Sequence, residues 1–284
     1  MNKKILLGLL LSAIAAGTFA QENEGIYSFK VGSFEVYMMV EAQRQGNTDI
    51  LIGASDSLLK RYIPETGFSG STNTFLIKAQ GKTILVDTAF GQALFEHLKK
   101  LNVAPDKIDA VLITHLHGDH FSGLQKDGTA LFPNAKVYIS ERELEYWTKT
   151  NVNQGAVAAL APYSSRVETF NPSDLNGELK ELLPGIIPIA NYGHTAGHTI
   201  FLVENSGEKF IIWGDMMHVE LIQFPNPDIS VTYDTNPRDA AVVRRQVLDY
   251  AAKNKIPIGG MHLVYPGIGM VEAEGSGYKL VPAK

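Results

Sequence analysis

Residues 114–120 read Thr-His-Leu-His-Gly-Asp-His, which places four candidate metal ligands close together: His115, His117, Asp119 and His120. Residues two apart cannot share one face of a helix, because helical neighbours are three or four residues apart. The segment is therefore predicted to be a tight loop, in which the glycine supplies backbone freedom. Three imidazoles and a carboxylate buried without a cation would leave polar groups unsatisfied. The stretch therefore predicts a metal site.

The sequence around this stretch alternates between strand and helix patterns. Strands are predicted at residues 74–78, 83–87, 110–114, 136–140, 210–213 and 256–260, after a hairpin at residues 27–40. Helices are predicted at residues 92–101, at 141–149, and from the capping pair Asn236-Pro237 to about residue 253, with a long loop and short helix at 47–68. Strands that alternate with helices indicate a layered α/β domain, whose site lies past the carboxyl ends of its strands.

Three more candidate ligands follow other apolar segments. His194 lies in a Gly-His-Thr-Ala-Gly-His motif, Asp215 follows the predicted strand at 210–213, and His262 follows the one at 256–260. Imidazole and carboxylate ligands without sulfur suit Zn²⁺, Mn²⁺, Fe or Co²⁺. The short histidine-rich stretch offers too many ligands for one tetrahedral ion. Two ions that share a bridging ligand are therefore predicted.

The composition excludes several classes of protein. The chain has 284 residues and is 45% hydrophobic, which argues for a folded core and against a disordered chain. It has no cysteine, so a disulfide scaffold, a thiolate zinc site and a cysteine nucleophile are excluded. The net charge is −5 and there is no basic block, so nucleic acid is not expected as a partner.

The first residues have the pattern of a secretory signal. A basic start is followed by an apolar run at residues 5–16 and by the small residues Thr18 and Ala20. This order predicts a cleaved signal peptide over residues 1–20 and a single mature domain over residues 21–284. A periplasmic or secreted location is expected, with no membrane association after cleavage.

The complete set of motifs resembles the metallo-β-lactamase superfamily. The shared motifs are His115-x-His117-x-Asp119-His120, Gly-His194-Thr-x-Gly-His198, Gly214-Asp215 and His262. A closer likeness is to the methyl parathion hydrolase branch, which includes lactonases and arylesterases. It rests on Leu85-Val86-Asp87-Thr88, Trp213-Gly-Asp-Met-Met-His218 with Gln223-Phe224, and His262-Leu-x-x-Pro266-Gly-Ile-Gly269.

This resemblance implies an α/β fold, a single-domain four-layer αβ/βα sandwich with a two-metal site at one edge. It implies one ion held by His115, His117 and His194, a second held by Asp119, His120 and His262, and Asp215 with a hydroxide bridging the two. Zinc is the expected metal, and manganese, iron or cobalt would also fit. Asp119 and Asp215 are the expected catalytic residues, since Asp119 can pass a proton to the leaving group.

Other residues are expected to support the ligands. Asp87 falls where the resembling family has an acid that orients ligand histidines, and His198 is expected to have a similar supporting role. His97 lies in a predicted helix and is expected to be exposed.

Some residues are expected to contact the substrate. The resemblance puts Phe90 and Trp147 near the pocket, and His218 is a further candidate contact. His218 stands where lactonase relatives carry a tyrosine, which weakens a direct transfer of lactone specificity. Additional candidates for an aromatic wall are Phe68, Phe121 and Phe224. Such a wall favours a small neutral or apolar substrate.

The leading functional hypothesis is a dinuclear metallohydrolase that uses a bridging hydroxide on neutral lactones, aryl esters or organophosphate triesters. One alternative is a thioesterase of the glyoxalase type. Another is a non-catalytic binding protein in which the metals only stabilise the fold. A homodimer is expected by analogy with the resembling family.

Overall fold

The computed structural model describes residues 20–23, 25–64 and 67–283. The predicted signal peptide therefore lies outside the described residues except for Ala20, and its cleavage stays a prediction. Within the described ranges, no helix is both long enough and apolar enough to cross a membrane.

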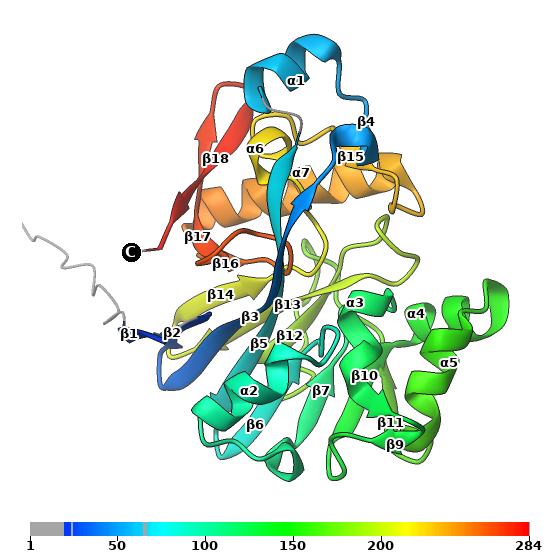
Figure 1. Ribbon diagram of the computed structural model, residues 1–284. Coiled ribbons are helices and arrows are strands. Elements are labelled where there is room, and N and C mark those ends of the chain that lie inside the picture. Colours follow the sequence, from blue (N-terminus) through cyan, green and yellow to red (C-terminus); the bar gives the residue numbers. More distant parts are fainter. Residues whose placement is uncertain (1–19, 24, 65–66, 284) are drawn as a thin grey trace, which may run out of the picture.

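Two β-sheets form the centre of the molecule (Figure 1). The eight-stranded sheet, in spatial order, contains β1 (Ala20–Asn23), β2 (Ile26–Val31), β3 (Phe34–Gly46), β5 (Phe68–Ala79), β6 (Lys82–Val86), β7 (Ala110–Leu112), β10 (Lys136–Ser140) and β11 (Val167–Phe170). The six-stranded sheet contains β12 (Ile186–Ala190), β13 (Thr199–Asn205), β14 (Glu208–Ile212), β16 (Ile258–Gly259), β17 (Ile268–Glu274) and β18 (Gly277–Pro282). Two short ladders pair β4 (Leu51–Ile52) with β15 (Ser230–Val231) and β8 (Gln125–Lys126) with β9 (Thr129–Ala130).

The helices lie outside the two sheets. They are α1 (Asp56–Tyr62), α2 (Ala93–Lys100), α3 (Gly118–Phe121), α4 (Glu141–Glu145), α5 (Gln154–Leu160), α6 (Glu220–Gln223) and α7 (Pro237–Asn254). In Figure 1, α2 and α5 lie in the lower half of the view and α7 in the upper half. Short 3₁₀ turns cover Thr48–Ile50, Pro105–Lys107, Ser122–Leu124 and Ala161–Tyr163, and a π-helical turn covers Tyr146–Thr150.

Alternation along the strands explains the layers, because successive side chains of a strand point to opposite faces of its sheet. In β5, Phe75 and Ile77 pack into the apolar layer that also receives Phe201 and Ile212 from the six-stranded sheet. Leu76, between them, points to the other face and packs with the core under α2 and α5.

The six-stranded sheet has the same organisation. Ile212 faces the inter-sheet layer, whereas its neighbour Ile211 packs against Val247 and Leu248 of α7. The order of layers is therefore helix, sheet, sheet, helix. This confirms the predicted single-domain α/β fold and its four-layer sandwich.

Most predicted elements exist, with differences at their ends. The predicted hairpin at 27–40 is the β2–β3 pair, but β3 continues to Gly46 and pairs there with β5, which begins at Phe68. Residues 69–73 read Ser-Gly-Ser-Thr-Asn and lack apolar alternation, so their pattern does not predict this extra pairing. Backbone hydrogen bonds to β3 hold this segment in the sheet without an apolar pattern.

Two predicted boundaries are wrong in detail. The histidine-rich stretch is not loop throughout, because α3 begins at Gly118 and carries Asp119 and His120 in its first turn. The helix predicted at 141–149 is α-helical only to Glu145 and continues as the π-helical turn.

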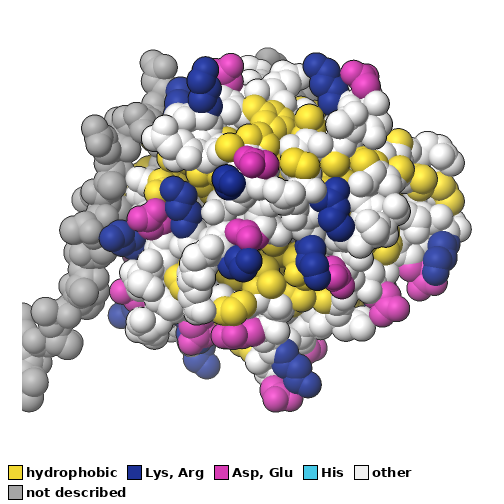
Figure 2. Space-filling view, turned by 90° about the horizontal axis from the view of Figure 1, so that it is seen from below, with side chains coloured by type: hydrophobic (Ala, Val, Ile, Leu, Met, Phe, Trp, Pro, Cys, Tyr) yellow, Lys and Arg dark blue, Asp and Glu magenta, His cyan; other side chains and the backbone are white. Residues whose placement is uncertain are grey.

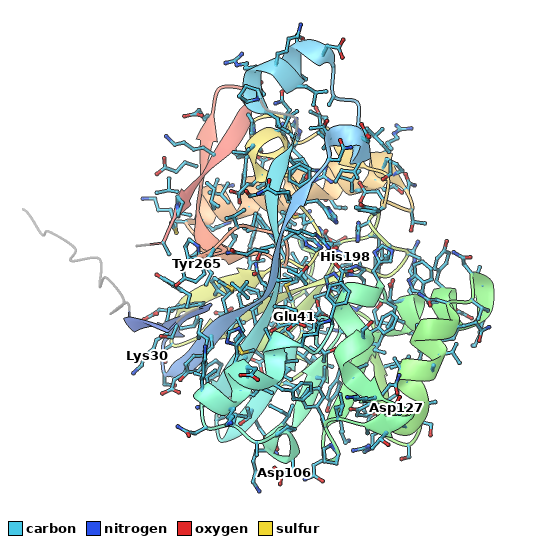
Figure 3. All side chains as sticks on the ribbon, in the orientation of Figure 1. Lys30, Glu41, Asp106, Asp127, His198 and Tyr265 are labelled. Atoms are coloured by element: carbon cyan, nitrogen blue, oxygen red, sulfur yellow. The ribbon has the colours of Figure 1, made fainter. Side chains whose placement is uncertain are left out.

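The prediction that His97 is exposed is wrong. His97 is buried, with 6% of its surface exposed, because α2 packs on β3. Its Nε2 donates a hydrogen bond to the Val40 carbonyl at 2.8 Å. Glu41, the next residue of β3, accepts hydrogen bonds from the Gln92 and Leu94 amides at the start of the same helix (Figure 3). Glu41 therefore fixes the start of α2, and the Val40 carbonyl fixes its buried face through His97.

Positively and negatively charged side chains are interspersed on the face of the molecule that Figure 2 shows. On the face that it shows, Lys and Arg side chains lie among Asp and Glu side chains and do not gather into one basic patch.

Candidate metal centre

The loops that follow four strands bring the predicted ligands together. His115 and His117 follow β7, His194 follows β12, Asp215 follows β14 and His262 follows β16. These segments are far apart in the chain, so the cluster forms only when the two sheets pack against each other. All seven predicted ligands lie in it.

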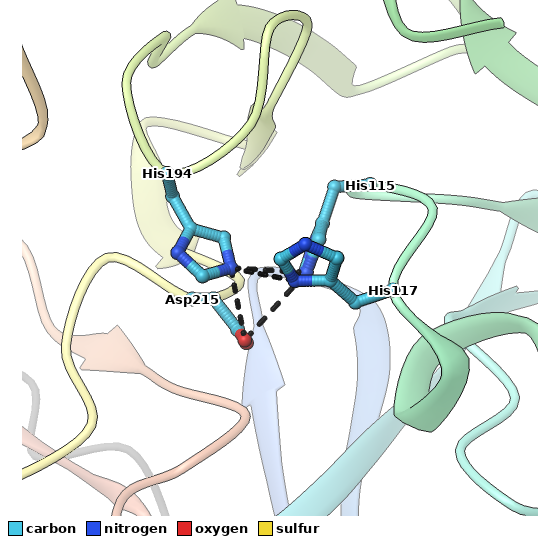
Figure 4. Close-up of side chains that lie close together, drawn as sticks. All are labelled: His115, His117, His194 and Asp215. Atoms are coloured by element: carbon cyan, nitrogen blue, oxygen red, sulfur yellow. Dashed lines mark hydrogen bonds and ion pairs between the residues drawn. The ribbon is translucent and has the colours of Figure 1, made fainter. Parts of the chain in front are cut away.

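The first group contains His115, His117, His194 and Asp215, whose ligand atoms all lie within 4.8 Å of one another (Figure 4). His194 Nε2 is 3.2 Å from His115 Nε2 and 3.1 Å from His117 Nδ1. It is also 3.4 Å from Asp215 Oδ2. Three imidazole nitrogens and one carboxylate oxygen therefore converge on one small volume.

The second group contains Asp119, His120 and His262, also within 4.8 Å. Asp215 lies beside this group as well, because its Oδ1 is 3.1 Å from His120 Nε2 and its Oδ2 is 2.9 Å from His262 Nε2. Asp215 is thus the carboxylate that the two groups share.

Three of the imidazoles are oriented by acceptors outside the cluster. The acceptors are an Asp87 carboxylate oxygen for His120 Nδ1 (2.7 Å), an Asp234 carboxylate oxygen for His194 Nδ1 (2.8 Å) and the Ser71 carbonyl for His262 Nδ1 (2.7 Å). An Nδ1 that faces an acceptor carries the proton, so each Nε2 presents its lone pair to the cluster. This is the arrangement by which proteins prepare histidines for metal binding.

The chemistry of these side chains suits two divalent cations. His120 Nε2 and Asp215 Oδ1 are buried and form no hydrogen bond. Leaving buried polar atoms unpaired is costly, and a cation between them would satisfy both. Imidazole nitrogens and carboxylate oxygens without sulfur form a donor set for zinc and similar ions.

The electrostatics of the cluster support the same interpretation. Burial and the neighbouring His194 lower the pKa of His117 to about 3. Burial acts in the same direction on His194, but hydrogen bonds to Asp215 and Asp234 raise the pKa of His194 to about 9. Although burial raises the pKa of Asp215, the adjacent His120 and His262 bring that pKa well below its usual value. The cluster therefore favours a neutral His117 and an ionised Asp215, which are the forms of these side chains that bind a metal ion.

Asp87 and His198 lie beside the ligands, not among them. Asp87 is fully buried and also accepts hydrogen bonds from the amide and hydroxyl of Thr114, at 2.8 and 2.7 Å. His198 Nε2 accepts a hydrogen bond from the Asp215 amide at 3.0 Å, and its Nδ1 donates to the Asn191 carbonyl (Figure 3). Gly214 makes this approach possible, since a Cβ there would lie only 2.5 Å from His198 Nε2.

Asp234 is a supporting residue that sequence reasoning misses. It lies in the loop before α7 and orients His194 through the hydrogen bond already described. Its other oxygen accepts from the Val231 amide at 3.0 Å and lies 3.8 Å from Arg244 Nη2. No short motif marks Asp234. The nearest sequence signal is the helix cap at Asn236, which only places the segment in a loop.

Arg244 of α7 is a buried cation behind this loop, with 1% of its surface exposed. Its guanidinium donates hydrogen bonds to three backbone carbonyls, those of Met216, Pro227 and Ile229, at 2.7–2.9 Å. Arg244 therefore ties the loop after Asp215 to the segment just before β15, and its Nη2 lies 3.8 Å from Asp234 in the loop after that strand.

Replacing Arg244 with Met is expected to lower the free energy of unfolding by about 3–5 kcal/mol, because the change removes the buried cation that lies 3.8 Å from the Asp234 carboxylate and its hydrogen bonds to three backbone carbonyls. Urea unfolding measures the change as a lower midpoint at constant slope. The matched control is Arg245→Met, which removes a surface pair with Asp228 and should change the free energy by less than about 1 kcal/mol. Equal effects of the two substitutions would contradict the structural role of Arg244.

A cavity of about 670 Å³ opens onto the cluster. His117, Asp119, Asp215, His218 and His262 form its floor. Its wall has apolar side chains, which are Ile50, Phe68, Phe90 and Tyr233. Arg44, from the extended end of β3, is also in the wall, with Nη2 3.9 Å from Asp119 Oδ2. No sequence motif points to this arginine, which is far from the ligand motifs in the chain.

The predicted substrate contacts differ in their positions. Phe90 lines the cavity and is 42% exposed. His218 also lines it, stacks on His262 and has a buried Nδ1 without a hydrogen-bond partner. Trp147 is not among the described residues that line the cavity; its ring packs edge-on against His117 and its Nε1 donates to Glu143.

Of the other aromatic candidates, Phe68 lines the cavity. Phe121 packs in the core under α2 and α5, and Phe224 packs against Trp213.

Comparison with known proteins gives a family match. The model described as "Metallo-beta-lactamase superfamily" matches residues 68–256. The chain is similar to the crystal structure of AbOPH, described as a hydrolase in the beta lactamase superfamily, with 27% identity and a TM-score of 0.83 over 93% of this chain and 99% of that one. It has the same fold as AidC, described as a dizinc quorum-quenching lactonase in complex with a product, with 23% identity and a TM-score of 0.83 over 92% and 98% of the two chains.

Curated relatives match over shorter regions. Exodeoxyribonuclease WalJ of Streptococcus pneumoniae is 30% identical over 121 residues, which are 41% of this chain and 43% of that protein. Hydroxyacylglutathione hydrolase of Francisella tularensis subsp. novicida is 27% identical over 164 residues, which are 57% of this chain and 54% of that protein. The chain thus spans about half the length of these curated relatives.

Proposed function

The chain belongs to the metallo-beta-lactamase superfamily, and on that basis we propose that it is a dinuclear metallohydrolase of small neutral lactones, aryl esters or phosphotriesters. The observation that carries the proposal is the pair of ligand groups joined by Asp215 at the floor of one cavity. Zinc is the proposed metal, on the donor set and on the likeness to AidC, which is described as a dizinc enzyme.

The two ions would supply Lewis acidity and lower the pKa of a bound water molecule to about 7. The residues of the chain have complementary tasks. Asp215 joins the two ligand groups, and Asp119 has a side chain that is 18% exposed to the cavity. From that position Asp119 can accept a proton and pass it to the leaving group. His218 lines the cavity with its Nε2 3.2 Å from Asp215 Oδ2, and it is a proposed contact for the substrate.

The substrate class follows from the cavity. A volume of about 670 Å³ suits a small molecule, and the wall of Phe68, Phe90, Ile50 and Tyr233 favours an apolar or aromatic group. AidC is described as a lactonase, which supports lactones as candidate substrates. The likeness to the methyl parathion hydrolase branch supports aryl esters and phosphotriesters. Membership in that branch, export from the cytoplasm and assembly as a homodimer are part of the proposal.

A second candidate function is a thioesterase of the glyoxalase type. The match to a hydroxyacylglutathione hydrolase favours it. Such a substrate would be larger and anionic, and Arg44 is the cationic group at the cavity wall that would meet it.

A substrate panel on protein of measured metal content separates these possibilities. We expect about two ions per chain and hydrolysis of at least one lactone, aryl ester or phosphotriester. Activity against β-lactams and glutathione thioesters is expected to be lower. A preference for the glutathione thioester would establish the second candidate. A protein that binds the metals and hydrolyses no member of the panel would be the non-catalytic binding protein.

A further inference from the structure

Glu143 is a buried carboxylate whose hydrogen-bond partners are all neutral. It lies in the first turn of α4 and has 0% of its surface exposed. Burying a charge in this way is costly unless several donors satisfy it. Glu143 belongs to neither ligand group and does not line the cavity, so its burial requires a separate explanation.

The two oxygens of Glu143 bind different loops of the metal centre. Oε1 accepts from the Leu116 amide at 2.8 Å and from Trp147 Nε1 at 2.7 Å. Oε2 accepts from the Thr195 hydroxyl at 2.8 Å and from the Gly197 amide at 2.7 Å. One carboxylate therefore joins two segments that are about 80 residues apart in the chain.

The donors lie directly beside the ligands of the first group. Leu116 is the residue between His115 and His117, and Thr195 immediately follows His194. The hydrogen bonds of Glu143 thus fix the backbone on which all three imidazoles of that group stand. Trp147 adds to this arrangement, since its ring packs edge-on against His117 with 5.5 Å between ring centroids.

The start of α4 is also locked onto the same loop. Ser140 Oγ, the cap of α4, donates to the Gly197 carbonyl at 2.8 Å and accepts from the Glu143 amide at 3.2 Å. A Cβ at Gly197 would collide with the Glu143 backbone nitrogen and Ser140 Oγ. Helix and loop therefore have little freedom to shift, and the carboxylate is held at a fixed place between the loops.

We propose that Glu143 is a positioning residue that sets the metal affinity of the group made by His115, His117 and His194. The inference rests on the proposed function in one respect, since both require bound ions. The second group should be independent of Glu143, because its histidines His120 and His262 are oriented by Asp87 and by the Ser71 carbonyl.

The charge of Glu143 matters because four donors need four lone pairs. An ionised carboxylate has about four acceptor sites, whereas the glutamine amide offers one acceptor oxygen and one donor group. In Glu143→Gln, the NH₂ group would face either the Leu116 and Trp147 donors or the Thr195 and Gly197 donors. The ligand loop on that side would then lose its anchor while the shape of the side chain is conserved.

The test uses the full chain loaded with Zn²⁺ and titrated with a competing chelator, with the retained ions counted at each step. In Glu143→Gln, one ion should be released at a chelator activity about 10–100-fold lower than in the wild type, since residues that orient ligands have effects of this size. The other ion should shift by less than about threefold. His194→Ala damages the first ligand group and His262→Ala damages the second. The ion that Glu143→Gln still binds tightly should have the affinity of the ion that His194→Ala retains, and should differ from the ion that His262→Ala retains.

The matched control is Glu145→Gln on the same helix. Glu145 is exposed and pairs with Lys149 at 3.6 Å, so both ion affinities should stay as in the wild type. Thr195→Val, which removes one donor to Glu143 and keeps the side-chain shape, should weaken the same ion by a smaller factor. If Glu143→Gln does not fold, the effect of Thr195→Val on the two ion affinities tests the proposal instead.

Unchanged release of both ions in a folded Glu143→Gln protein would overturn the proposal. Equal weakening of both ions, in step with a lower melting temperature, would also overturn it, because that result indicates a general structural role. The titration needs no substrate. If the wild type binds two ions and hydrolyses nothing, the proposed function fails and the assignment of Glu143 is still decided by the ion affinities.

Discussion

Asp215→Asn is expected to lower kcat/KM by about 100-fold or more while the fold is retained, a loss that corresponds to about 2.7 kcal/mol of transition-state stabilisation. The carboxylate is shared by both ligand groups, with its oxygens 2.9 Å from His262 Nε2 and 3.1 Å from His120 Nε2. Asparagine keeps the size of the side chain and the backbone hydrogen bond to His198. It removes the negative charge and one of the two oxygens that join the groups.

The measurement is steady-state hydrolysis of the best panel substrate, with circular dichroism to check the fold. The control is Asp228→Asn, which neutralises an exposed carboxylate that pairs with Arg245 on the surface. The control should have wild-type activity. A folded Asp215→Asn protein with unchanged hydrolysis would refute the role of the shared carboxylate and the hydrolase assignment with it.

Removal of the metals is expected to abolish hydrolysis and to lower the melting temperature. An ion present at 100 times its dissociation constant contributes about 2.7 kcal/mol to the folded state. For a chain of this size that corresponds to a shift of about 5–10 °C for one ion. The physical reason is that the empty cluster leaves buried atoms such as His120 Nε2 and Asp215 Oδ1 without partners.

The experiment is a thermal melt and an activity assay after chelation, followed by return of Zn²⁺, Mn²⁺, Co²⁺ or Fe²⁺ in separate samples. Recovery of both stability and activity is expected, and the ion that restores most activity identifies the best metal for catalysis. Full activity in protein shown to be free of metal would exclude a metallohydrolase. Recovery of stability without any activity would favour the binding protein.

The ligand residues can be predicted because their signal is local. The spacing of His115, His117, Asp119 and His120 is unusual in any protein, and it follows an apolar strand. His194, Asp215 and His262 also follow apolar segments, and loops after strands are where an α/β sheet places its site. The fold class can be predicted for the same reason, since strand and helix periodicities are properties of short windows.

Two details of the packing could not be predicted from the helices alone. His97 is predicted to be exposed, but packing of its helix on β3 buries it. Trp147 is expected near the pocket, and the structure shows its ring edge-on against His117 and its indole nitrogen donating to Glu143. In both cases the partner is set by the three-dimensional packing, and no periodicity within the helix identifies it.

The sequence by itself determined which side chains can bind metal, in what order they occur, and the layered α/β architecture that collects them. The tertiary structure alone decided that Asp234 and Ser71 orient two of the imidazoles, that Arg44 reaches the cavity, and that Glu143 joins two ligand loops. The physical reason is that a hydrogen bond depends on distance and direction in space. Its partners can come from any two segments that the fold brings within about 3 Å, so the sequence near either partner carries no mark of it.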